Sequence, residues 1–292
     1  MGTERISGTT GLLCVIGSPV GHSLSPVMYN YAFDRLGLDY VYVAFDIKED
    51  QVPDALQAMR TFHMRGMNVT MPDKIAAARG CDELSKAAEI IGAANTIVNE
   101  NGKLIGHMTD GIGFNNNLRD HGVEVKGKKV TIVGGGGAAT AIEVQSALDG
   151  AKAISIFNIK DKFFPRIEET ARKIMDAVPD CQVKVMDLAD ESAFKKEILE
   201  SDILINATIL GMKPMDDKSV VRDMSVFHEG LVVADTVYNP LETKLLRDAK
   251  AHGCKVVNGR GMLLWQGEAA FRLYTGQEMP VEELKQLYFK EE

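Results

Sequence analysis

The sequence is poor in cysteine and has no long apolar run. Its four cysteines, at positions 14, 81, 181 and 254, show neither the spacing of metal ligands nor a C-x-x-C pattern. We therefore expect free thiols in a reducing compartment and no metal site. No run of about 18 apolar residues is present, which argues against a membrane span. The first residues also lack the apolar core of a signal peptide, and this favours a cytoplasmic location.

Charge of one sign is never concentrated in the sequence either. The chain has 33 Lys and Arg residues against 41 Asp and Glu residues, a formal net charge of −8, and the two signs are interspersed. Because no basic block is present, we expect neither nucleic acid nor an anionic membrane surface as a partner. The 292 residues, 45% of them hydrophobic, are enough for one large domain or two ordinary ones. Both a monomer and a homodimer agree with this composition.

The first part of the chain shows a mixed pattern. Apolar runs predict three strands, at residues 12–16, 40–45 and 64–70. A single helix is expected over residues 75–92, closed by a glycine. Two further strands flank an Asn-Gly turn at residues 101–102, as in a β-hairpin. We therefore predict an N-terminal α/β domain over residues 1–111.

The second part alternates between strands and helices. From Lys129 onward each strand-like run is followed by a helical one, as a parallel, doubly wound sheet requires. The helical stretch from Met262 to Phe289 lies outside this alternation. We predict an α/β protein with a second domain over residues 112–262, and we expect residues 263–292 to pack back on the first domain.

A glycine turn joins the first strand and helix of the second domain. Its spacing, Gly134-x-Gly136-x-x-Ala139, fits the dinucleotide fingerprint. The first glycine makes the tight turn, the second admits the pyrophosphate, and the small third residue lets helix and strand pack closely. The turn therefore predicts a Rossmann-type NAD(P)-binding domain.

An acidic residue follows the next strand of this domain. An acid in this position binds the ribose hydroxyls of the adenosine and repels a 2′-phosphate. Asp161 is the candidate, which favours NAD. Lys160 beside it would tolerate the phosphate, so NADP stays open as an alternative coenzyme.

A lysine and several polar residues stand at the ends of expected strands and loops. Lys74 follows a strand and a Pro turn, and Asp110 stands where a helix begins. A lysine near an aspartate can hold a hydroxyl group and exchange its proton. Taken singly, Ser23, Ser25 and Asn95 are ordinary turn residues.

Together, these segments resemble the shikimate dehydrogenase family. The motifs GHSLSP, NVTMPDK, IGAANTIV, GHMTDGIGF, GGGGAA, NATILGM, VYNP and GMLLWQG occur in the family's order between Ile16 and Gln266. The stretch FNIKDKFF is most similar to the quinate/shikimate dehydrogenase branch. The resemblance implies reversible NAD(P)-dependent oxidation of shikimate to 3-dehydroshikimate, a step of aromatic amino acid biosynthesis. It also implies oxidation of quinate to 3-dehydroquinate.

The resemblance also implies roles for individual residues. Lys74 is similar to the proton-transfer residue, and Asp110 to its partner. Six residues resemble ligands of the substrate: Ser23, Ser25, Thr70, Asn95, Tyr238 and Gln266. Twelve resemble the surroundings of the coenzyme: Gly135, Gly136, Gly137, Ala138, Asn158, Ile159, Lys160, Asp161, Thr208, Met212, Val237 and Gly259.

Two departures from the family pattern leave alternatives open. Ile159 stands where the biosynthetic branch has an arginine for the NADP phosphate. Asp73 stands just before Lys74, where an aromatic residue or histidine is common, and it either acts on Lys74 or faces water. The base is Lys74, Asp110 or the coupled pair. The rival functions are a quinate-preferring NAD-dependent dehydrogenase and a non-catalytic dinucleotide-binding regulator.

Overall fold

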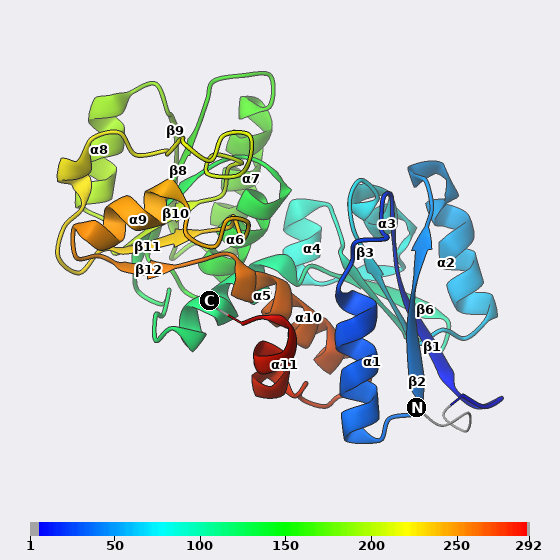
Figure 1. The fold of residues 1–292 in the computed structure, drawn as a ribbon. Coiled ribbons are helices and arrows are strands. Elements are labelled where there is room, and N and C mark those ends of the chain that lie inside the picture. The colour runs from blue at the N-terminus through cyan, green and yellow to red at the C-terminus, as the bar shows by residue number, and fades with distance from the viewer. Residues whose placement is uncertain (1–5, 291–292) are drawn as a thin grey trace. The chain divides into compact units, whose positions relative to one another are not determined.

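A computed structural model describes residues 6–290, which form two compact units (Figure 1). The first unit consists of residues 6–109 and 267–290, and the second of residues 110–266. The chain therefore returns to the first unit near its C-terminus.

The first unit is built around a mixed sheet. Its elements are β1 (Gly11–Gly17), α1 (Ser25–Leu36), β2 (Tyr40–Asp46), η1 (Glu49–Gln51), α2 (Val52–Thr61), β3 (Gly66–Val69), α3 (Lys74–Gly80), β4 (Glu83–Leu84), α4 (Lys86–Ile91), β5 (Thr96–Glu100), β6 (Lys103–His107) and α11 (Val281–Tyr288). The strand order is β2-β1-β3-β5-β6-β4. β1 is parallel to β2 and β3, whereas β5 is antiparallel to β3 and β6.

Alternate residues of β1 face the two sides of this sheet, as the period of a strand requires. Cys14 and Ile16 pack into a cluster with α2 and α3. On α1, Tyr29 stacks on Tyr42 of β2 and on Phe271 near the end of the chain. The Tyr29 hydroxyl also donates to the Gly267 carbonyl over 3.0 Å. The returning C-terminal segment thus completes this core beside α1 (Figure 1).

The single helix predicted over residues 75–92 is wrong. α3 ends at Gly80, Cys81 is extended, and β4 separates α3 from α4. Asp82 accounts for the break, because its N–H donates to the Leu104 carbonyl and its carboxylate accepts from the Leu104 N–H. A new helix then begins after Ser85, whose side chain accepts from the Ala88 N–H. Pairing with β6 therefore overrides the local helical pattern. The Asn101–Gly102 hairpin turn is confirmed, with both residues at positive φ.

The second unit is a doubly wound parallel sheet, which confirms the predicted fold class. Its elements are α5 (Asp110–Asp120), β7 (Lys129–Val133), α6 (Gly137–Leu148), β8 (Ala153–Asn158), α7 (Phe164–Ala177), β9 (Gln182–Asp187), α8 (Glu191–Leu199), β10 (Ile203–Asn206), η2 (Met224–Val226), β11 (Val232–Asp235), α9 (Lys244–Ala251) and β12 (Lys255–Val257). α10 (Arg260–Thr275) begins here and ends in the first unit. The strand order is β12-β11-β10-β7-β8-β9, and neighbouring strands are parallel.

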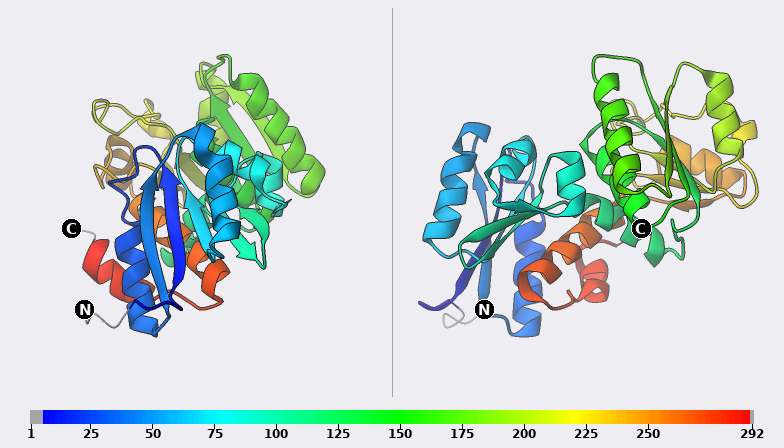
Figure 2. Two further views of the ribbon diagram at one scale, coloured as in Figure 1. Left: turned by 90° about the vertical axis from the view of Figure 1, so that its right-hand side faces the viewer. Right: turned by 180° about the vertical axis from the view of Figure 1, so that it is seen from behind.

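Helices cover this sheet from both faces (Figure 2). One face packs on α8 and α9 through Phe194, Ile198 and Leu245. α5 packs closely on α6. A Cβ atom built at its ideal position on Gly111 of α5 would lie only 2.2 Å from the Ala141 carbonyl oxygen of α6. The order reverses between β7 and β10, so the carboxyl ends of these strands flank a switch point, the usual ligand site of such sheets.

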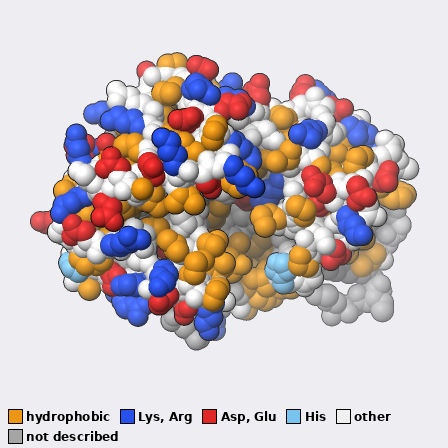
Figure 3. All heavy atoms as spheres, turned by 90° about the horizontal axis from the view of Figure 1, so that it is seen from above, with side chains coloured by type: hydrophobic (Ala, Val, Ile, Leu, Met, Phe, Trp, Pro, Cys, Tyr) orange, Lys and Arg blue, Asp and Glu red, His pale blue; other side chains and the backbone are white. Residues whose placement is uncertain are grey.

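The surface does not concentrate charge of one sign on the face seen from above. Figure 3 shows basic and acidic side chains side by side there. Among residues 6–290, each helix is too short or too polar to cross a bilayer.

Candidate functional site

Five of the predicted residues gather at one edge of the first sheet. β1 and β3 run parallel and end at this edge, whereas the antiparallel β5 begins there. Ser23 lies in the loop after β1 and Ser25 opens α1, while Thr70 follows β3, Lys74 opens α3 and Asn95 precedes β5. Close contacts hold the segments together. The Ala94 N–H donates to the Lys74 carbonyl over 2.9 Å. An ideal Cβ at Gly17 would lie 2.3 Å from Thr70 Cγ2.

Asn95 is oriented by a buried polar network. Its Oδ1 accepts from the Thr109 N–H over 2.8 Å, and its Nδ2 donates to Thr109 Oγ1 over 3.0 Å. Thr96 adds a bond from its hydroxyl to Oδ1, 3.1 Å long. Asn95 is 3% exposed. Its amide is therefore held in one orientation next to the sheet edge.

Asp73, beside Lys74, is buried rather than turned to water. The residue is 0% exposed, and neither carboxylate oxygen has a hydrogen-bond partner among the described residues. It stands at the start of α3 without capping the helix through its side chain. Burial, with a smaller contribution from the charge of Glu49, raises the pKa of Asp73 above its usual range. Of the two readings of Asp73, exposure to water is therefore wrong.

The glycine turn of the second unit has the geometry of a phosphate cradle. Gly134 has a φ of +130°, and an ideal Cβ there would lie 2.6 Å from the Ala207 carbonyl oxygen. Side chains at Gly136 and Gly137 would meet nothing within 4 Å, so the turn is open on the side of the helix start. The first N–H groups of α6 have no partner within the helix. Open space in front of unpaired N–H groups fits a dinucleotide pyrophosphate.

The four residues predicted to surround the adenosine lie at the end of β8 and in the segment that follows it. Asn158 ends β8, and Ile159, Lys160 and Asp161 are exposed. Asp161 Oδ1 accepts from the Phe163 N–H over 2.9 Å, which closes the turn into α7. Asp161 is thus fixed at the carboxyl edge, one strand away from the glycine turn.

The loops after β10 and β11 carry four further residues of the predicted site. Thr208 and Met212 lie after β10, while Val237 and the 48% exposed Tyr238 lie after β11. Gly259 approaches the β11 loop, since an ideal Cβ there would lie 2.2 Å from the Thr236 carbonyl oxygen. The strands end in two buried polar residues, Asn206 and Asp235, that the sequence analysis missed. A polar residue at the end of an apolar run, as in ILIN and VVAD, was the available signal.

Asp110 and Gln266 lie on two helices that pack together. Asp110 is the first residue of α5, and Gln266 lies in α10. An ideal Cβ at Gly113 would lie 2.5 Å from the Gln266 backbone nitrogen, so the helices cross closely there. The second unit therefore places Gln266 against α5, three residues along that helix from Asp110. Lys74 belongs to the first unit.

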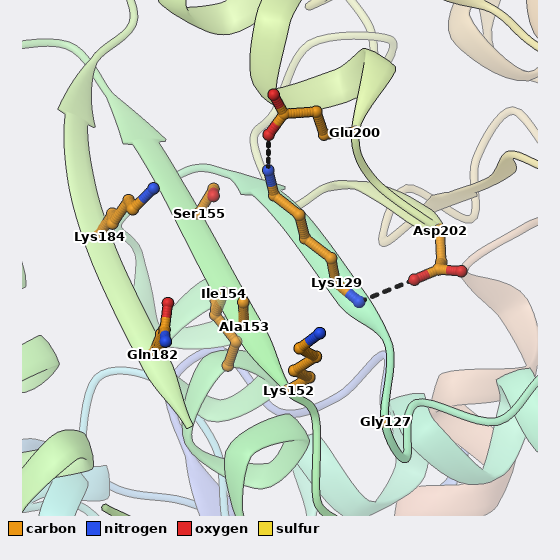
Figure 4. Close-up of a pocket in the computed structure, with 10 residues that line it drawn as sticks. All are labelled: Gly127, Lys129, Lys152, Ala153, Ile154, Ser155, Gln182, Lys184, Glu200 and Asp202. Carbon is orange, nitrogen blue, oxygen red and sulfur yellow. Dashed lines mark hydrogen bonds and ion pairs between the residues drawn. The ribbon is translucent and has the colours of Figure 1, made fainter. Parts of the chain in front are cut away.

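A groove of about 410 Å³ lies at the opposite edge of the second sheet (Figure 4). It is lined by residues of β7, β8 and β9, including Lys129 and Lys184, and by Glu200 at the end of α8. Lys129 Nζ pairs with Glu200 at 2.8 Å, and with Glu197 at 2.6 Å. Lys129, Lys184, Glu200 and Asp202 of this groove are all in ion pairs, and the groove lies away from the glycine turn. Within residues 6–290, no cluster of His, Cys, Asp and Glu side chains could hold a metal ion.

Two family models match the chain. Residues 15–97 match the shikimate dehydrogenase substrate binding domain, and residues 259–287 match the shikimate 5′-dehydrogenase C-terminal domain. A shikimate dehydrogenase (NADP(+)) from Streptococcus uberis is 50% identical over 293 residues, which cover 99% of each chain.

Solved structures agree with these matches. The shikimate 5-dehydrogenase of Listeria monocytogenes, in complex with shikimate and NAD, is 47% identical, with a TM-score of 0.94 over 98% of each chain. A quinate dehydrogenase from Corynebacterium glutamicum, in complex with NAD, is 29% identical with a TM-score of 0.85, covering 96% of this chain and 99% of its own. Since identity near one half extends over almost the whole length, the chain belongs to the shikimate dehydrogenase family.

Proposed function

We propose that this chain is a shikimate dehydrogenase, which reversibly oxidises shikimate to 3-dehydroshikimate in aromatic amino acid biosynthesis. The main support is the gathering of Ser23, Ser25, Thr70, Lys74 and Asn95 at one edge of the first sheet. The chain that carries them is 50% identical to a shikimate dehydrogenase. Quinate is the second substrate of the proposal, oxidised to 3-dehydroquinate.

Lys74 and Asp110 carry the proton transfer. Oxidation of a ring alcohol removes a hydride from carbon and a proton from the hydroxyl group, so a base has to stand at the oxygen. The bound coenzyme supplies the hydride acceptor. Lys74 takes the hydroxyl proton, with Asp110 as its partner, and returns it to the carbonyl oxygen in the reverse reaction. The rival assignments make Asp110 the base, or make the two a coupled pair.

The remaining polar residues suit a polyhydroxylated ring acid. The hydroxyl groups of Ser23, Ser25 and Thr70 can donate to a carboxylate and accept from a ring hydroxyl. Asn95, Gln266 and Tyr238 complete the proposed substrate ligands. Because Thr109 already fixes the amide of Asn95, this ligand is preorganised before substrate arrives.

The coenzyme is held by the second unit. Gly135, Gly136, Gly137 and Ala138 would bind the pyrophosphate at the start of α6. The segment of Asn158, Ile159, Lys160 and Asp161 would surround the adenosine. The rest of the coenzyme site would be lined by Thr208, Met212, Val237 and Gly259.

We propose NAD as the preferred coenzyme and NADP as the alternative. Ile159 cannot bind a 2′-phosphate as an arginine does, and the Asp161 carboxylate repels one. The Listeria monocytogenes structure contains NAD, whereas the Streptococcus uberis relative is named for NADP(+). Both coenzymes therefore belong in the test.

The domain assignment and the setting complete the proposal. We assign the substrate to residues 1–111 together with 263–292, and the coenzyme to residues 112–262. All four cysteines are free thiols in the structure, which supports a reducing compartment such as the cytoplasm. We propose a monomer or a homodimer.

The first test is an absorbance assay of the reduced nicotinamide that crosses shikimate and quinate with NAD and NADP. We expect the highest kcat/KM for shikimate with NAD. A higher value for quinate would favour the quinate-preferring dehydrogenase, which the Corynebacterium glutamicum neighbour brings forward as second candidate. No turnover in any combination, with coenzyme binding intact, would favour the non-catalytic regulator.

Two variants test the assigned residues. Lys74→Met should lower turnover by at least about a thousandfold while the coenzyme still binds, since general acid–base catalysis contributes roughly that much. Lys86→Met is its control, because Lys86 is exposed in the same unit and pairs with Glu89 on its own helix. Asp161→Ala should narrow the NAD over NADP preference by about tenfold, or 1.4 kcal/mol. An unchanged preference would remove Asp161 from the site.

A further inference from the structure

Two buried polar residues end neighbouring strands at the carboxyl edge of the second sheet. Asn206 is the last residue of β10 and Asp235 the last of β11, and the two are in register. They are 1% and 0% exposed. Asn206 Nδ2 donates to Asp235 Oδ1 over 2.9 Å. This amide–carboxylate pair therefore bridges two strands at the edge where such sheets bind ligands.

Asn206 fixes the loop after β10. Its Oδ1 accepts from the Thr208 hydroxyl over 2.7 Å and from the Thr208 N–H over 3.1 Å. Its Nδ2 also donates to the Leu210 carbonyl over 3.0 Å. The Thr208 hydroxyl accepts in turn from the Leu210 N–H over 3.1 Å. The hydroxyl group and the N–H of Thr208 therefore form hydrogen bonds within the loop, and Asn206 fixes the position of the loop backbone.

Asp235 fixes the loop after β11. Its Oδ1 accepts from the Val237 N–H over 2.9 Å, and its Oδ2 accepts from Thr243 Oγ1 over 2.7 Å. The Val237 carbonyl accepts from the Gly259 N–H over 3.2 Å. The carboxylate therefore sets the place of Val237, and through it that of Gly259.

The pair also reaches the glycine turn. The residue after Asn206 is Ala207, and its carbonyl oxygen lies 2.6 Å from the ideal Cβ position of Gly134. The turn thus rests directly on the β10 loop. A shift of Asn206 would move this support, so three loops at the coenzyme edge depend on one buried pair.

We propose that Asn206 and Asp235 are positioning residues that set coenzyme affinity by holding the β10 loop, the β11 loop and the glycine turn in one arrangement. This inference rests on the proposed function in placing the coenzyme at this edge.

The charge of Asp235 makes the arrangement sensitive to pH. Burial raises the pKa of Asp235 to about 6, against the lowering effect of its hydrogen bonds. The groups that face it are uncharged: Asn206 from β10, Val237 and Thr236 from its own loop, and Thr243, which caps the start of α9. A protonated carboxyl group loses acceptor capacity. The loops should therefore be held less firmly below about pH 6.

The test is calorimetric titration of Asp235→Asn with NAD and with NADP, together with steady-state kinetics. The introduced amide nitrogen cannot accept from Val237, Thr243 or Asn206 as the carboxylate does. We expect the coenzyme Kd to rise at least tenfold, whereas the KM for shikimate changes less than twofold. The wild-type Kd should rise as pH falls through 6, and that of the variant should not.

A rescue variant and a control sharpen the result. Asn206→Asp combined with Asp235→Asn exchanges the amide and the acid, restores their mutual hydrogen bond and should recover part of the affinity. Asp190→Asn is the control, because this exposed acid caps α8 and its replacement should leave the coenzyme Kd unchanged. Should Asp235→Asn not fold, Thr243→Val removes one bond to Asp235 and should raise the Kd about threefold.

Two results would overturn the inference. One is a lower thermal stability of Asp235→Asn with an unchanged coenzyme Kd, which is the mark of a merely structural residue. The other is a rise in the KM for shikimate as large as the rise in the coenzyme Kd. Calorimetry reads binding without turnover, so a wild-type protein that binds coenzyme but oxidises neither shikimate nor quinate would refute the proposed function and leave this inference standing.

Discussion

Asp73 and Asp235 stand at corresponding places in the two units. Each lies at a sheet edge where parallel strands end, and each is 0% exposed. Both oxygens of Asp235 accept hydrogen bonds, whereas neither oxygen of Asp73 has a partner among the described residues. Burial raises the pKa of both carboxyl groups. What differs is the surroundings, since Asp235 faces neutral donors and Asp73 faces the charge of Glu49.

The difference teaches that burial alone does not tell what an acid does. A buried carboxylate is costly unless hydrogen bonds replace its water. Asp235 has that replacement and orders two loops with it. Asp73 lacks it, so its negative charge opposes folding. Replacement by the neutral amide should therefore break the hydrogen bonds that hold two loops at position 235. At position 73 it breaks no such bond among the described residues and should stabilise the first unit.

The largest expected effect on stability comes from a third buried acid, Glu143 of α6. It is 1% exposed, its Oε1 has no partner among the described residues, and burial raises its pKa to about 8. Because the folded state holds this proton more tightly than the unfolded state does, the free energy of unfolding falls as pH rises from about 4.5 to about 8. Glu143→Gln should raise it on the order of 4 kcal/mol at pH 9, measured by urea unfolding.

Glu197 of α8 is the matched control for Glu143. It is also buried, but it accepts from Ser155 over 2.7 Å and pairs with Lys129 at 2.6 Å. Burial alone would raise its pKa, but these bonds together hold it below the usual range. Glu197→Gln should therefore lower stability above about pH 4.5, the opposite sign. If both variants changed the free energy of unfolding at pH 9 by the same amount and in the same direction, hydrogen-bond partners would not explain the difference between these two acids.

A smaller effect on stability is expected at Thr243, which donates a hydrogen bond to Asp235. Its hydroxyl donates to Asp235 and caps α9 by accepting from the Leu246 N–H. Thr243→Val keeps the shape and should cost about 1–2 kcal/mol in the free energy of unfolding. Thr170→Val is the control, because the hydroxyl of Thr170 donates to the Arg166 carbonyl in its own helix. A loss at Thr243 no greater than the loss at Thr170 would show that Asp235 does not need this bond.

The second unit could be predicted from the sequence more fully than the first. Its strands and helices alternate with short connections, so the pattern from Lys129 onward already defines a doubly wound sheet. In the first unit, residues 75–92 read as one helix, and only pairing of β4 with β6 breaks it. That pairing joins segments about twenty residues apart, which no local pattern reveals.

The candidate site shows the same limit. The glycine turn and the polar residues around Lys74 carry recognisable motifs, so they could be named in advance. Asn206 and Asp235 could not be paired, because their bond depends on the register of β10 with β11. The burial of Asp73 was equally hidden, since an acid at the start of a helix normally caps it or faces water.

The smallest expected effect is at Asp73 itself. Its raised pKa means that the free energy of unfolding falls as pH rises above about 3.8, the ordinary value of the group. Asp73→Asn removes the charge in the same shape, so the variant should unfold at a higher temperature than wild type, increasingly so toward neutral pH. The gain should be smaller than that of Glu143→Gln. Thermal unfolding at pH 4 and pH 8 measures it.

Asp50→Asn is the control for Asp73, because Asp50 is exposed in the same unit and its replacement should change little. If Asp73→Asn instead lowered stability at pH 8, the carboxylate of Asp73 would have to be partnered in solution, and the nearest candidate would be the ammonium group of the adjoining Lys74. Asp73 would then resemble Asp235 as a positioning residue, and the contrast between the two sheet edges would disappear. A gain confined to pH 8 keeps the contrast, because a buried acid without hydrogen-bond partners opposes folding once it is ionised.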